Sequence, residues 1–157
     1  MLPYFSSFFF INSYIFQEKQ FAEMISLMST SKPWTYKIWS DSLKKQLSSW
    51  TMYIPGVSSS PEVAHLKVFS SILEKMTEDE LNNKSEINGV ARERLAKTSG
   101  KTVDEVNKMV FFYKQSLAVA TWLQLKVSLK EKIPKTDLEM NEMQEKDHRM
   151  KSIATKM

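Results

Sequence analysis

The chain has 157 residues and a net charge of +4, and it contains three glycines, five prolines and no cysteine. This length supports one domain with a hydrophobic core, or a small core with arms. The absence of cysteine excludes disulfides, thiolate metal sites and cysteine nucleophiles. A small excess of positive charge is compatible with binding to RNA, to an acidic protein face or to an anionic membrane, and it does not distinguish among these partners.

The amino-terminal segment is apolar and aromatic. Residues 1–17 contain no charged side chain, and aromatic residues crowd between Phe5 and Phe16. The segment lacks the positive start of a secretory signal and the arginines of a mitochondrial presequence, and it is short for a membrane span. We predict an aromatic arm over residues 1–15 that is buried against a partner or the protein's own core. Contact with a membrane interface through residues 1–16 and an uncleaved targeting signal are the alternatives.

Apolar residues at helical spacing predict an all-α fold, and no β-strand is convincing. In chain order, the expected helices cover residues 14–28, 35–50, 61–76, 77–83, 86–98 and 103–132. Pro61 suits a first helical position. Gly100 suits a left-handed helix end, and Pro134 is expected to close the longest helix.

Three capping boxes mark helix starts, each with a threonine followed three residues later by a glutamate. They are Thr77–Glu80, Thr102–Glu105 and Thr136–Glu139. The last opens a charged helical tail over residues 133–157. Its methionines recur at spacings of three and seven: Met140, Met143, Met150 and Met157.

The sequence contains few candidate groups for catalysis. His65 and His148 lack a nucleophile or metal-ligand companion at a meaningful spacing. Acidic pairs such as Asp104–Glu105 lie in first helical turns, where they complement the helix dipole. With three isolated glycines there is no phosphate-binding loop. We therefore predict a non-enzyme with no cofactor, no metal and no small-molecule substrate.

Residues 86–113 form a helix-turn-helix-like unit, with a short helix, a glycine turn and a long helix. Basic residues outnumber acidic ones in and around this unit by six to four. The basic residues are Lys84, Arg92, Arg94, Lys97, Lys101 and Lys108, and the acidic ones are Glu86, Glu93, Asp104 and Glu105. This excess leaves two interpretations open, RNA contact and a solvated helix face. The methionines are similarly ambiguous, since they can line an apolar groove or fill the core.

Several motifs support a family resemblance. The stretches 72–81 (ILEKMTEDEL), 87–89 (ING), 94–100 (RLAKTSG) and 103–107 (VDEVN) resemble the methionine-rich M domain of the signal recognition particle GTPase, here without the GTPase domain. The Ile54-Pro55-Gly56 turn and the first predicted helix are similar to that family as well. The resemblance places an M-domain-like helical domain over residues 16–132, and its "ING" form looks bacterial or organellar.

In that family the domain binds RNA through the helix-turn-helix and holds signal sequences in a hydrophobic groove. The resemblance therefore implies possible RNA contacts at Arg92, Arg94, Lys97, Ser99, Gly100 and Lys101. It implies groove or partner contacts at Phe16, Phe21, Met24, Ile25, Met28, Phe69, Met76, Met109 and Phe112. However, Val90 and Ala91 replace a serine and an arginine of the family motif, and Thr98 replaces a glycine. These changes remove phosphate contacts.

Two functions are consistent with these features. The first is an accessory or structural subunit of a large organellar assembly, either a mitochondrial ribosome or a respiratory-type complex, built on a repurposed M-domain fold. The alternative is a signal-sequence-binding and RNA-binding module in protein targeting. We expect partner proteins and possibly RNA. The first function implies a mitochondrial location, with a plastid or the bacterial cytoplasm as alternatives.

Overall fold

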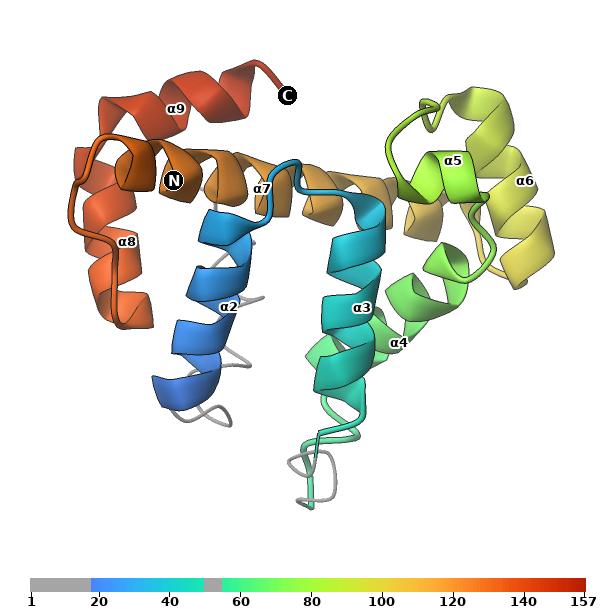
Figure 1. Cartoon of the computed structure of the whole chain (residues 1–157). Helices are drawn as coiled ribbons and strands as arrows, with labels where there is room; N and C mark the ends of the chain where they lie inside the picture. Colours follow the sequence, from blue (N-terminus) through green and yellow to red (C-terminus); the bar gives the residue numbers. More distant parts are fainter. Residues whose placement is uncertain (1–17, 50–54) are drawn as a thin grey trace. The chain divides into compact units, whose positions relative to one another are not determined.

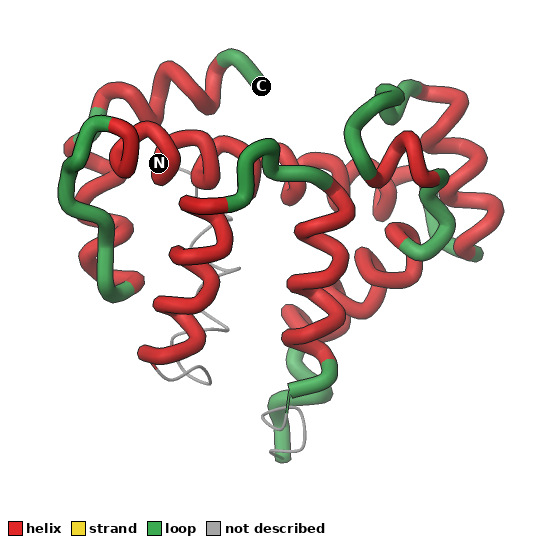
Figure 2. Tube along the Cα trace, in the orientation of Figure 1, coloured by secondary structure: helices red, strands yellow, loops and turns green. Residues whose placement is uncertain are grey.

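The computed structural model describes residues 18–49 and 55–157, and every regular element in these ranges is an α-helix (Figure 2). The helices are α2 (Glu18–Thr30), α3 (Tyr36–Leu47), α4 (Pro61–Leu73), α5 (Glu78–Leu81), α6 (Gly89–Ser99), α7 (Val103–Ser128), α8 (Asp137–Lys146) and α9 (His148–Thr155) (Figure 1). The predicted all-α fold is confirmed. The predicted aromatic arm and Ile54 lie outside the described residues.

The chain divides into two compact units. Unit 1 contains described residues 18–34 and 114–157, which supply α2, the second part of α7, α8 and α9. Unit 2 contains described residues 35–49 and 55–113, which supply α3 to α6 and the first part of α7. The predicted boundaries after residues 15 and 132 stay predictions.

In unit 2, α3 packs against α4 and α5, and α4 packs against α6. Its largest buried side chains include Trp39, Leu43, Val63, Phe69, Ile72, Leu73, Leu95, Val106 and Met109. The Tyr36 ring stacks on the Tyr113 ring with 3.6 Å between centroids. Asn83 joins both tyrosines, because its amide oxygen accepts the Tyr36 N–H at 3.2 Å and its amide nitrogen donates to the Tyr113 hydroxyl at 2.7 Å. These two bonds fix Asn83 at a φ of 58°, a left-handed conformation that asparagine tolerates well.

In unit 1, the core is formed by apolar residues of both chain stretches. They are Phe21, Ile25, Met28, Trp34, Ala118, Val119, Ala120, Trp122, Leu123, Met140 and Met150. The Trp34 indole donates to the Ser116 hydroxyl at 3.0 Å. The Gln124 amide donates to the carbonyl oxygens of Met28 and Ser31 at 3.0 and 2.8 Å. Since the last carbonyls of a helix lack partners within it, Gln124 satisfies the carboxyl end of α2.

Four of the predicted local helix signals are confirmed by the structure. Pro61 is the first residue of α4, after the N-cap Ser60. The Thr77–Glu80 capping box is complete. Gly100 ends α6 at a φ of 67°, where any side chain would be strained. The Thr102–Glu105 box is also formed. Its glutamate accepts the Thr102 N–H at 2.8 Å, and its own N–H donates to the threonine hydroxyl at 3.1 Å.

Several helix boundaries in unit 2 differ from the prediction, among them the end of α3, which lies at Leu47. We expected α4 to extend to Met76, but it ends at Leu73 and the Met76 N–H donates to the Leu73 carbonyl in a tight turn. Met76 is nevertheless buried. The apolar residue at this position therefore indicates burial, and not that the helix continues to it. We expected α6 to begin near Glu86. It begins at Gly89, because the Asn88 side chain accepts the N–H of Ala91 as the N-cap.

The long helix α7 ends at Ser128, not at Lys132, so Pro134 is not what stops it. Lys130 has a φ of 56°, and the Glu131 N–H donates back to the Lys126 carbonyl at 2.9 Å. This closure is typical of a left-handed helix end.

The carboxyl-terminal tail forms two helices rather than one, and they differ in direction (Figure 1). Asp147 separates them, because its extended backbone ends α8 while its side chain caps α9. Only half of the third capping box forms. The Glu139 N–H donates to the Thr136 hydroxyl at 3.2 Å, but the Glu139 carboxylate binds the Lys135 N–H and Lys132 instead of the Thr136 N–H.

Candidate functional site

The helical corner in unit 2 is built from α6, Gly100 and the start of α7. The left-handed Gly100 allows the Lys101 N–H to donate to the Ala96 carbonyl at 3.0 Å, and the Thr102–Glu105 box then starts α7 at once. Both ends of the turn are therefore hydrogen-bonded, and the corner is a rigid feature of the unit.

Arg94, the retained arginine of the motif, makes its hydrogen bonds and its ion pair to other residues of unit 2. Its guanidinium forms an ion pair with the Glu80 carboxylate and donates to the Lys75 carbonyl at 3.2 Å. Glu80 is 5% exposed. Burial alone raises the pKa of this carboxyl, but the hydrogen bonds from Arg94 and the Thr77 N–H outweigh that effect and leave the pKa below its ordinary value. Arg94 therefore joins α6 to the α4–α5 turn.

Arg92 also makes internal contacts. Its Nε donates to the Ile87 carbonyl at 3.0 Å, and its Nη1 donates to the Asn107 side chain at 2.9 Å. It thus ties the segment before α6 to α7. Both arginines of the corner hold the fold, and a phosphate would have to compete with these partners.

The other predicted RNA contacts surround the turn. Lys97 is exposed and Lys101 is half-buried. The Ser99 hydroxyl donates to the Leu95 carbonyl at 2.6 Å, within its own helix. Lys108 pairs with Asp104 at 2.8 Å. The turn therefore presents lysines beside carboxylates, a mixed surface rather than a uniformly basic one.

The predicted groove residues that are described are mostly buried. Phe21, Ile25 and Met28 belong to the core of unit 1, and Phe69, Met76 and Met109 belong to the core of unit 2. Met24 and Phe112 are half-buried, and the Phe112 ring lies 5.3 Å from that of Phe69. Phe16 lies outside the described residues. Their burial is consistent with a role in filling the core. A groove formed by these residues stays a prediction.

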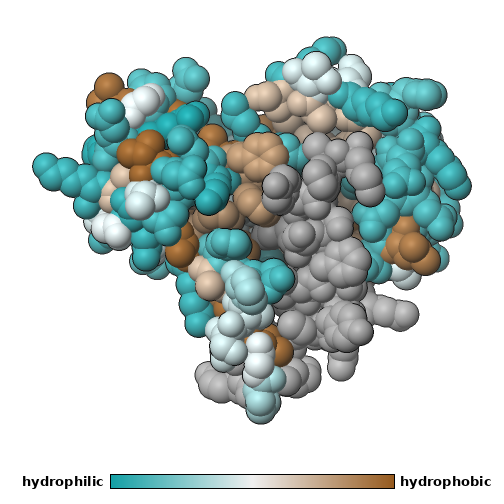
Figure 3. Space-filling model, turned by 180° about the vertical axis from the view of Figure 1, so that it is seen from behind, coloured by the Kyte–Doolittle hydropathy of each residue, from teal (hydrophilic) through white to brown (hydrophobic). Residues whose placement is uncertain are grey.

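Among the side chains that the structure describes, few large apolar ones are exposed. They are Val90, Val103, Phe111, Val127, Leu129 and Leu138. On the face seen in Figure 3, hydrophobic areas are small and lie between hydrophilic ones. Single exposed apolar residues are ordinary on protein surfaces. They do not mark a binding site by themselves.

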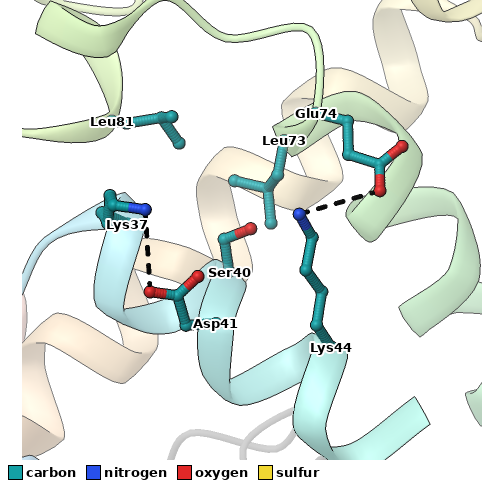
Figure 4. Close-up of a pocket in the computed structure, with 7 residues that line it drawn as sticks. All are labelled: Lys37, Ser40, Asp41, Lys44, Leu73, Glu74 and Leu81. Carbon is teal, nitrogen blue, oxygen red and sulfur yellow. Dashed lines mark ion pairs between the residues drawn. The ribbon is translucent and has the colours of Figure 1, made fainter. Parts of the chain in front are cut away.

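Unit 2 has a small pocket of about 170 Å³ among α3, α4 and α5 (Figure 4). Lys37 pairs with Asp41, and Lys44 pairs with Glu74, each with 3.8 Å between nitrogen and oxygen. Ser40, Leu73 and Leu81 complete the lining. Two lysines and two carboxylates balance, so the pocket does not favour anions, and it is smaller than the usual pocket for an organic ligand.

Metal and membrane features are not found in the described ranges. No group of three or more potential His, Asp or Glu ligands lies close enough there to hold a metal ion. His65 and His148 are both exposed, and the His65 ring stacks 6.4 Å from that of Phe69. No described helix is long and apolar enough to cross a membrane.

Unit 1 contains an ionic cluster that sequence reasoning missed. Ion pairs link Lys126, Glu131, Arg149 and Asp147 in that order, and Asp147 accepts the N–H of the buried Trp122 indole. The sequence signal was weak, because these residues look like ordinary members of a charged tail, and Arg149 is 18 positions from Glu131. In unit 2, Glu80 was recognised only as a cap, although it also anchors Arg94.

Comparison with known proteins identifies a family. A family model described as "Signal peptide binding domain" matches residues 15–132. A search of curated proteins finds no match to the chain. The matched range includes the helical corner and the Arg94–Glu80 pair, and it stops before α8 and α9.

Proposed function

Since the chain belongs to the signal peptide binding domain family, we propose that it is a binding module of protein targeting that takes an apolar helical segment of the signal-peptide type. The match over residues 15–132 is the observation that carries this proposal. Signal peptides have an apolar stretch of about 7–15 residues. An all-helical protein with ten methionines suits such varied apolar ligands, because methionine side chains adapt in shape.

The match favours this role over that of an accessory subunit in an organellar assembly. A peptide-binding family needs an apolar contact surface, and among the predicted groove residues Met24 and Phe112 are half-buried and therefore partly accessible. A mitochondrial location stays a prediction.

Direct binding tests this function. A fluorescent peptide with a lysine start and a ten-leucine core is titrated with the full chain, and its anisotropy is recorded. A peptide with the same composition but with charges distributed through the core is the control. We expect saturable binding of the first peptide alone. Equal binding of both peptides, or of neither, contradicts the proposal.

Met24→Gln locates the contact surface. Met24 is half-buried on α2, so a polar side chain of similar length tests apolar contact with little disturbance of the core. We expect weaker peptide binding by about 5-fold, roughly 1 kcal/mol. Val90→Gln is the matched control, since Val90 is an apolar side chain on α6 that is 78% exposed. Equal losses in both variants contradict a specific role for Met24.

RNA binding at the corner is a second candidate function, favoured by the exposed Lys97 and the neighbouring Lys101. Each lysine that contacts a phosphate adds about 0.7 to 0.9 to the slope of log affinity against log salt. The Lys97→Ala/Lys101→Ala double variant should therefore lower that slope by about 1 to 2. The Lys37→Ala/Lys44→Ala double variant, with both lysines on α3, is the control for the loss of two positive charges. Arg94→Ala is unsuitable as a first test, because it also removes the partner of the buried Glu80.

A further inference from the structure

We propose that residues 133–157 act as an internal ligand of the rest of unit 1, so that α8 and α9 must be displaced from α2 and the second part of α7 before a peptide binds there. This inference rests on the proposed function. It concerns a segment that lies outside the matched range of residues 15–132.

Two hydrogen bonds join Arg149 of the tail to Glu131, just after α7, and further bonds join Arg149 to Asp147 within the tail. Every nitrogen of the Arg149 guanidinium donates. Nη1 and Nη2 bind the two Glu131 oxygens at 3.0 and 2.7 Å, while Nε and Nη2 bind Asp147 at 2.7–3.2 Å. The planar fork of arginine fits two carboxylates in this way, and lysine cannot reproduce it. We call Arg149, Asp147, Glu131, Lys126 and Trp122 the clasp.

Trp122 connects the clasp to the core. Its side chain is fully buried on α7, and its indole N–H donates to the Asp147 carboxylate at 2.8 Å. Lys126 lies 5.2 Å from the centre of the Trp122 ring and pairs with Glu131 at 3.0 Å. The junction between α8 and α9 is therefore fixed to a core side chain of α7.

The tail also supplies apolar side chains that a peptide ligand would supply. Met140 of α8 is 2% exposed and Met150 of α9 is 4% exposed. Met143 and Ile153 lie three residues further along each helix and are half-buried. Since i and i+3 share one helical face, each short helix has an apolar edge, and that edge is wholly or partly buried. In this respect the tail is a helical ligand with methionine and isoleucine contacts.

The tail is suited to displacement because its helices are short. α8 has 10 residues and α9 has 8, and helices of this length are marginal by themselves in water. Their order therefore depends on docking and on the clasp. A bound tail lowers the fraction of molecules that can accept a peptide, and the apparent Kd rises by the same factor.

The test compares three full-length proteins: the natural chain, Arg149→Gln and Lys151→Gln. Lys151 is an exposed residue of α9, so its variant has the same charge change in the same helix but leaves the clasp intact. Each protein is titrated with the ten-leucine peptide. We expect Arg149→Gln to bind at least about 5-fold tighter than the natural chain, which is a modest coupling between two sites, and Lys151→Gln to match the natural chain.

Hydrogen exchange supplies a second measurement on the natural chain, which does not depend on the folding of a variant. Peptide binding should accelerate exchange at the amides of residues 137–155, because displaced helices lose protection. Equal affinities of the three proteins, or unchanged exchange in the tail upon peptide binding, overturn the inference and leave the proposed function intact. No binding by any of the three proteins overturns both.

Discussion

Arg94 in unit 2 and Arg149 in unit 1 each hold a chain reversal, but their surroundings differ. Arg94 has one carboxylate partner, Glu80, whose side chain is 7% exposed. Arg149 has two carboxylate partners, Glu131 with a side chain that is 35% exposed and Asp147 with one that is 13% exposed. Water screens the Arg149–Glu131 pair most, whereas loss of Arg94 leaves the most deeply buried of the three carboxylates without its partner. Burial of the partner, rather than the number of ion pairs, therefore decides which arginine stabilises the fold more.

The largest expected effect comes from Arg94→Ala. Breaking a buried ion pair costs about 3–5 kcal/mol, and since the Arg94 side chain is 38% exposed we expect about 2 kcal/mol after allowing for solvent screening. Chemical denaturation of the full chain measures this free energy of unfolding. Lys97→Ala in the same helix should change it by less than about 0.5 kcal/mol. Equal effects of the two variants would refute the structural role of Arg94.

The two regions also contain comparable left-handed turns, at Gly100 with a φ of 67° and at Lys130 with a φ of 56°. Gly100→Ala should destabilise the chain by about 1 kcal/mol, because an L-residue strains this backbone conformation. A Cβ atom at this position meets no neighbouring atom within 4 Å, so the cost is conformational rather than steric. Thermal unfolding measures it, and an unchanged Tm would contradict it.

Lys130→Gly is the converse change and should have a smaller effect of opposite sign. Glycine removes the strain of the left-handed residue but increases the entropy of the unfolded chain. We expect a net gain of about 0.5 kcal/mol in the free energy of unfolding. A loss of stability would show that the lysine side chain contributes contacts that outweigh the strain.

The smallest effect concerns pH. Hydrogen bonds from Arg149 and then from Lys126 lower the pKa of Glu131 from 4.5 to about 2. A lowered pKa in the folded state contributes stability that is fully present above pH 4.5 and is lost as the pH falls toward about 2. The Tm difference between the natural chain and Arg149→Gln should therefore shrink between pH 5 and pH 2. A constant difference would show that Arg149 acts by packing alone.

Local signals made much of the fold predictable. Thr77 with Glu80, Pro61 and Gly100 act through neighbours within a few residues, so their effect can be inferred from spacing. The early end of α7 could not be inferred in this way, because the left-handed residue that closes it is Lys130, a residue type with no preference for that conformation. Met76 shows a related difficulty. An apolar residue can be buried in a turn as well as in a helix, so its presence in the sequence does not tell which of the two it belongs to.

The candidate site was harder to predict for the same reason. The motif marked Arg94 as a possible RNA contact, and a sequence comparison cannot show that Glu80, 14 residues earlier, already holds its guanidinium. Lys97 is exposed on the corner helix, and its predicted RNA contact stays a prediction. Partners of a long side chain are a tertiary property, and they appear only with coordinates.

The division of the chain has a consequence for its synthesis. Unit 2 is one stretch, residues 35–113, whereas unit 1 joins residues before it to residues after it. Since domains fold as their residues emerge during translation, unit 2 has all of its sequence available while unit 1 still lacks Trp122 and the clasp. We therefore expect the apolar side of α2 to be exposed in the nascent chain until its core partners have been synthesised. At this stage the chain should depend most on chaperones.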